Sequence, residues 1–156
     1  MGAIFRWVRD LWLGRQQLGQ TTERATAVVT AATVPLFTVS GGRIKVTQII
    51  GEVTVAIQAL ATNVRLSHNP TVGTTRNICV NLNIASYALG DLLGIDGINT
   101  SAMLPPASSG VIEAQTMGVI VQEGTIDLIS TAAPTGSIRW TLKWVPIDTG
   151  AAVIAA

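Results

Sequence analysis

The sequence has little charge. Charged residues make up 12% of the chain, and ten basic and nine acidic residues leave a net charge of +1, whereas an ordinary soluble domain is about 25% charged. A chain with almost no net charge is not expected to bind nucleic acid by neutralising phosphates. So little charge also makes a poorly soluble monomer. We therefore expect the protein to contact copies of itself or another protein, and not nucleic acid.

Residues that bind metals or form disulfides are also scarce. Cys79 is the only cysteine and His68 is the only histidine, which excludes an internal disulfide, a cysteine-rich metal framework and a multi-histidine zinc site. His68 precedes an Asn-Pro turn without a G-x-S-x-G motif, so we interpret it as a strand-end residue and not as a catalytic base. Cys79 has no basic neighbour in sequence that would activate its thiol.

The acidic residues form no recognisable catalytic or calcium motif. Asp91 and Asp96 flank an apolar segment but lack the D-x-D-x-D-G pattern of a calcium loop. Glu113, Glu123 and Asp127 are spread over predicted strands, and the sequence leaves open whether they meet. There is no P-loop and no G-x-G-x-x-G. We predict that the protein is not an enzyme and binds no cofactor or metal.

β-Branched residues, in contrast, are abundant. The 156 residues include 16 Val, 16 Ile and 19 Thr, which favour strands, and the length suits one domain. From Ala25 onward apolar residues recur with a period of two. The strands that we predict cover 34–39, 43–50, 52–58, 63–68, 78–85, 119–122, 125–130 and 138–144, with a long connection over 91–110.

The strand at 138–144 has the clearest alternation. Ile138, Trp140, Leu142 and Trp144 are expected to face the core. Turn residues separate the predicted strands, so we predict an all-β domain over residues 25–156, a β-sandwich or jelly roll. The longest uncharged stretch, 25–42, is close to the length of a membrane span, but its β-branched runs favour two short strands, so a membrane role is not expected.

Residues 1–24 have a different pattern. Apolar side chains at positions 4, 7, 8, 11 and 12 follow the spacing of one helical face, and residues 15–24 are polar and aperiodic. The pattern predicts an N-terminal amphipathic helical arm, made of a helix and a linker. Charges at Arg6, Arg9 and Asp10 interrupt its apolar segment, so it is not a secretory signal.

The arm has three possible roles: packing on its own domain, lying on a membrane surface, or docking on a neighbouring protein. Aromatic and Arg residues concentrate binding energy at interfaces, which favours docking. The predicted partner-binding residues are Ile4, Phe5, Trp7, Val8, Leu11 and Trp12.

Four segments carry a resemblance to a known group of proteins. They are Leu36–Gly42 (LFTVSGG), Ile50–Thr54 (IGEVT), Ala61–Leu66 (ATNVRL) and Trp140–Pro146 (WTLKWVP). With them, residues 34–156 resemble small uncharacterised proteins encoded by tailed bacteriophages, and no catalytic motif is part of the likeness. The resemblance implies a structural protein of the virion, and β-sandwich proteins that decorate and cement capsids, commonly as trimers, are closest in size and architecture.

We therefore expect a capsid decoration subunit, located in the virion, that forms a homotrimer and binds the major capsid protein or another virion protein. Two alternatives stay open. One is a component of the tail or of a head fibre, or its anchor. The other is a carbohydrate-binding adhesion module, for which Asn81, Asn83 and Tyr87 are the local candidates.

Overall fold

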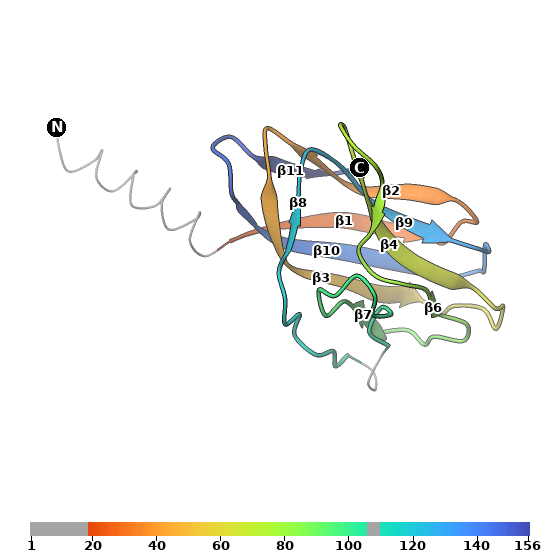
Figure 1. Cartoon of the computed structure of the whole chain (residues 1–156). Coiled ribbons are helices and arrows are strands. Elements are labelled where there is room, and N and C mark those ends of the chain that lie inside the picture. Colours follow the sequence, from red (N-terminus) through yellow and green to blue (C-terminus); the bar gives the residue numbers. More distant parts are fainter. Residues whose placement is uncertain (1–18, 106–109) are drawn as a thin grey trace.

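The computed structural model describes residues 19–105 and 110–156. They form an all-β structure of eleven strands in two antiparallel sheets (Figure 1). Sheet A contains β1 (Gln20–Val28), β3 (Ile44–Val55), β7 (Leu92–Gly94), β8 (Val119–Val121) and β10 (Ser137–Pro146). Sheet B contains β2 (Thr33–Ser40), β4 (Asn63–Pro70), β5 (Arg76–Asn77), β6 (Leu82–Asn83), β9 (Gly124–Ser130) and β11 (Ala152–Ala155).

The chain passes repeatedly from one sheet to the other. In sheet A the order is β1-β10-β3, and both β7 and β8 pair with the far side of β3. In sheet B the order is β11-β2-β9-β4, and both β5 and β6 pair with β4. Strands that are neighbours in sequence, such as β1 and β2 or β9 and β10, therefore lie in different sheets. The core lies between the sheets and takes apolar side chains from both.

The prediction for β10 is confirmed. Ile138, Trp140, Leu142 and Trp144 are all buried, whereas Lys143 is exposed on the other face. The register places Trp140 opposite Gly51 of β3, and a Cβ atom at Gly51 would lie 2.8 Å from the indole ring. A glycine at this position therefore makes room for the largest side chain of the core.

The polar segment before Ala25 is part of the domain, so the predicted linker ends earlier than expected. Residues 20–24 form the first half of β1, and Arg24 pairs with Trp140 of β10. The segment looks aperiodic because its inward residues are polar. Thr22, for example, accepts a hydrogen bond from Trp144 Nε1 at 3.1 Å. The sequence pattern alone does not distinguish such a strand from a linker.

Two other strand predictions are corrected. The strands predicted at 43–50 and 52–58 are one continuous strand, β3. The strand predicted at 78–85 is wrong as a single element: β5 ends at Asn77, β6 covers only Leu82–Asn83, and Val80 forms an isolated bridge with Ala102. Ile78 and Cys79 are both buried although they are consecutive, which a regular pleat does not allow.

Residues 91–110 contain the short strand β7, and Leu93, Ile95 and Met103 of this segment are buried in the core. The apolar segment 149–156 contains β11, which pairs with β2. Residues 25–42 hold the end of β1 and all of β2 as strands, as expected. Within the described ranges no helix is long and apolar enough to cross a membrane.

An ion pair joins two turns that connect the sheets. Arg43 follows the Gly41-Gly42 turn between β2 and β3, and Asp148 follows β10. Asp148 accepts hydrogen bonds from the Arg43 backbone N at 2.8 Å, from Nε at 2.9 Å and from Nη2 at 2.8 Å. These bonds hold the pKa of the Asp148 carboxyl well below its usual range.

Candidate interaction surfaces

His68 and Cys79, the candidates for a base and a nucleophile, are each held by a hydrogen bond within the domain. The His68 Nδ1 lies 3.0 Å from the carbonyl of Thr125, and burial lowers the pKa of the imidazole, so the ring is neutral at pH 7 and donates from Nδ1. Cys79 is buried, and its Sγ accepts a hydrogen bond from the Leu66 backbone at 3.2 Å. Burial raises the pKa of the thiol, which keeps it protonated and unreactive.

The carboxylates of the described residues do not form a metal-binding cluster. Among the residues that the structure describes, no group of three His, Cys, Asp or Glu side chains is placed to hold a metal ion. Asp91 and Asp96 bind the backbone of their own turns: Asp91 accepts from Ala88 N and Asp96 from Ile98 N, both at 2.7 Å. Both are local contacts between a side chain and the backbone that stabilise turns, and the one at Asp96 is an Asx turn.

The residues considered for sugar binding are mostly occupied within the chain. Asn83 Oδ1 accepts hydrogen bonds from the backbone N–H groups of Thr62 and Ala85, and Asn81 Oδ1 accepts one from Arg65. Tyr87 packs against the core. Because Trp140 and Trp144 are also buried, neither offers an exposed aromatic platform for a sugar.

The outer face of sheet A is charged. Arg139 lies between two carboxylates and pairs with Glu52 on β3 and, at 3.8 Å, with Glu23 on β1. Lys143 and Lys45 are exposed on the same face. The charges of this face thus largely compensate one another across three adjacent strands.

The outer face of sheet B is nearly free of charge. One row across it, given by the strand register, is Ile154, Thr38, Thr125 and Asn69. Arg65 and Asp127 carry the only charges among the strand residues on this face, since Arg76 of β5 lies opposite His68 on the inner side. Asp127 is only 4% exposed, and the Arg65 guanidinium donates to Asn81. The face therefore presents threonine, asparagine and aliphatic side chains to its surroundings.

The two lateral openings between the sheets differ as well. Beside β1 and β11 the opening is bridged by polar side chains: Thr22 Oγ1 donates to the carbonyl of Val153 at 3.4 Å, and Arg24 Nε donates to that of Ala156 at 3.2 Å. These bonds tie the first strand of sheet A to the last strand of sheet B. We call this side the closed edge.

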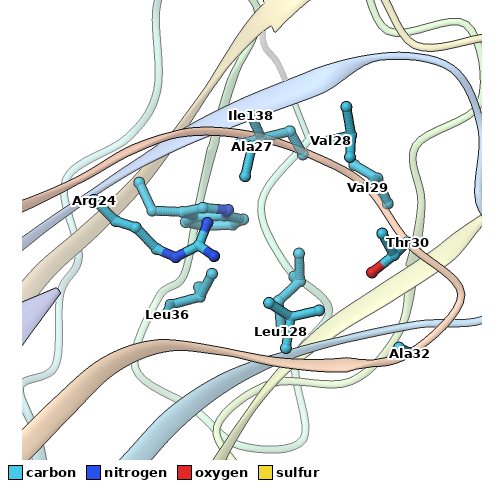
Figure 2. Close-up of a pocket in the computed structure, with 11 residues that line it drawn as sticks. Arg24, Ala27, Val28, Val29, Thr30, Ala32, Leu36, Leu128 and Ile138 are labelled. Atoms are coloured by element: carbon cyan, nitrogen blue, oxygen red, sulfur yellow. The ribbon is translucent and has the colours of Figure 1, made fainter. Parts of the chain in front are cut away.

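A cavity of about 20 Å³ lies at the closed edge, under the turn from β1 to β2. Figure 2 shows Arg24 pointing into the space that Leu36, Leu128 and Ile138 also face. A space of this size holds about one water molecule. The cavity is therefore a packing gap and not a ligand site.

The opposite opening, between β5 and β8, is a cleft of about 290 Å³. We call this side the open edge. Its lining comprises His68, Arg76, Asn77, Ile78, Gly97, Asn99, Val119, Ile120 and Val121. No sequence pattern pointed to this cleft, because its residues come from four separate segments that are brought together only by the pairing of β5 with β4 and of β8 with β3.

The predicted partner-binding residues Ile4, Phe5, Trp7, Val8, Leu11 and Trp12 lie outside the described residues. Comparison with known proteins adds no assignment: no family model, curated protein or solved structure matches the chain.

Proposed function

We propose that the protein is a structural subunit of a virion that decorates and stabilises a capsid. The first support is the strand order. If the pairs β5/β6 and β7/β8 each count as one position, sheet A has the order 1-8-3-6 and sheet B the order 2-7-4-5. That is the strand order of a jelly roll with β11 added, an architecture used by viral capsid proteins and by lectins. The argument is one of fold-level analogy.

The observation that carries the proposal is the nearly uncharged outer face of sheet B. Thr38 and Thr125 lie at its centre, and Ile154 at its edge is 62% exposed. Charged groups are costly to desolvate at the centre of an interface, so a face whose central row carries none is suited to permanent contact. In a symmetric assembly the same surface meets itself or its neighbour. We assign this face to contact between copies of the chain, in a homotrimer.

The second part of the proposal is the predicted N-terminal arm, residues 1–24 in the sequence analysis, of which residues 20–24 belong to β1. Its predicted partner-binding residues would bury apolar surface on the major capsid protein, and each large side chain contributes about 1.5–3 kcal/mol before ordering costs. In the sequence the predicted arm precedes β1, whose first residue, Gln20, pairs with Trp144 of β10. A trimer would present three arms, and multivalency would strengthen attachment without further contacts.

Deletion of residues 1–18 tests the role of the arm. Strand β1 begins at Gln20, so this deletion keeps every described strand. The shortened protein should keep its thermal unfolding transition and lose binding to particles that lack the protein. A second variant, the full chain with both Trp7→Ala and Trp12→Ala, removes only two aromatic side chains of the arm and should show the same loss of particle binding.

Normal particle binding by the shortened protein would contradict the proposal. The number of copies in purified virions separates the alternatives: a decoration protein is present in hundreds of copies, whereas an anchor of a tail or head fibre is present in a few.

A further inference from the structure

His68 occupies an unusual position at the open edge. It is the only histidine of the chain, and it lies on the same side of β4 as the core residues Val64 and Leu66. Its Nδ1 donates to the Thr125 carbonyl at 3.0 Å, since a carbonyl can only accept. Its Nε2 is buried and forms no hydrogen bond with another described residue. Protonation therefore puts a donor and a positive charge on an atom without an acceptor, which is costly.

The charged groups around the ring do not compensate that charge. On β5, Arg76 lies opposite His68 in the register and is itself positive. On β9, Asp127 favours the charged ring, but it faces the outer side of sheet B, between two core residues of its strand. The residues of β8 and of the loop after β7 that line the cleft are uncharged. Burial is the dominant influence, and it lowers the pKa of His68 below its usual value of about 6.5.

Strand β5 is the element that can yield when the ring is charged. It has two residues and pairs with β4 alone, and residues 71–77 are all exposed. Strand β9, on the other side of β4, has seven residues and is paired along both edges. Segments with few buried contacts open locally at a lower cost than the whole domain unfolds. Displacement of β5 would bring water to Nε2 without separating the two sheets.

We propose that the open edge is an acid-sensitive gate, in which protonation of His68 at Nε2 releases β5 from β4 and widens the cleft between β5 and β8. The released form binds the proton more readily than the native form. The native pairing therefore loses stability as the pH falls below about 6.5. Release would expose the apolar lining residues Ile78 and Val121, which are 7% and 2% exposed in the native form. The gate does not depend on the proposed role in a virion.

Amide hydrogen exchange of the full chain, followed by NMR, tests the proposal. The backbone N of Ile78 donates to the Leu66 carbonyl at 2.9 Å, so its exchange reports on the pairing beside β5. Its protection, corrected for the intrinsic pH dependence of exchange, should fall between about pH 7.5 and about pH 5. The fall should reach up to about tenfold for each unit that separates the pKa of His68 in the two forms. Amides of β10 should stay better protected at both pH values, because the opening is local.

His68→Gln should abolish the pH dependence of the Ile78 exchange in this range. Arg76→Glu should reduce it, because residues directly opposite in a sheet are close enough for a carboxylate to pair with the charged ring. Arg76→Gln is the matched control: it removes the positive charge without supplying an acceptor and should keep more of the pH dependence than Arg76→Glu does.

The wild-type ring signals test the same point without any substitution, because His68 is the only histidine. They should titrate below about pH 6.5. The proposal is overturned if the ring titrates at or above that value, or if the protection of Ile78 is the same at both pH values. It is also overturned if His68→Gln keeps the pH dependence, or if Arg76→Glu keeps as much of it as Arg76→Gln.

Discussion

The outer faces of sheets A and B differ in charge, although both sheets are made of antiparallel strands rich in β-branched residues. On sheet A, Arg139 pairs with Glu23 and Glu52 across three strands. On sheet B the equivalent central positions are Thr38 and Thr125. Solvated ion pairs contribute little to stability, so the charges of sheet A serve mainly to keep that face in water. The difference in charge supports the proposal that sheet B, and not sheet A, contacts other copies of the chain.

The largest effect is expected on the inner face of sheet A. Trp140 is 1% exposed, so Trp140→Ala should lower the free energy of unfolding by about 3–5 kcal/mol, a large part of the about 5–15 kcal/mol of a typical domain. Lys143→Ala, on the outer face of the same strand, should cost less than about 0.5 kcal/mol. Denaturant titrations measure both variants.

If Trp140→Ala and Lys143→Ala lowered the free energy of unfolding by similar amounts, the distinction between a stabilising inner face and a solvated outer face would be wrong. An unchanged denaturation midpoint for Trp140→Ala would show that the indole is not part of the core.

A smaller effect is expected at the ion pair that joins the two sheets at their turns. The pKa of Asp148 is held low by hydrogen bonds from Arg43, so its carboxylate stabilises the folded state above the unfolded pKa of about 3.9, and this contribution is lost as the pH falls below that value. Asp148→Asn should therefore lower the melting temperature at pH 7, and the difference from the wild type should narrow below about pH 4.

Thermal unfolding of both proteins across that pH range is the measurement. A difference that stays constant from neutral to acidic pH would mean that the charge of Asp148 is not what stabilises the junction. The melting temperature of Arg139→Gln provides a comparison. This variant removes the ion pairs of Arg139 with Glu23 and Glu52 on the outer face of sheet A, which are not fixed by a backbone hydrogen bond.

The sequence predicted the regular strands well, because their alternation is a direct consequence of a pleat with one buried face. Trp140 and Trp144 were placed in the core on this basis, and the structure confirms it. The prediction failed where inward residues are polar, as with Thr22 in β1, and where the backbone is irregular, as with Ile78 and Cys79. In both cases tertiary contacts, and not local pattern, determine burial.

The candidate surfaces were harder to predict from the sequence than the strands. Low overall charge indicated a contact surface but not which sheet carries it, because that depends on strand register. The cleft at the open edge could not be predicted at all, since Arg76, Asn99 and Ile120 are far apart in sequence. The predicted partner-binding residues of the arm lie outside the described residues, and their role stays a prediction.

Light scattering at micromolar concentration tests the central claim, that the outer face of sheet B joins copies of the chain, most directly. The wild-type protein should be an oligomer. Thr38→Glu, on this face, should weaken association by at least about a hundredfold, because an unpaired carboxylate would be desolvated in the interface. Thr141→Glu, which places the same side chain on the outer face of sheet A, should leave the oligomer intact. A monomeric wild type, or an oligomer that tolerates Thr38→Glu as well as Thr141→Glu, would contradict the account.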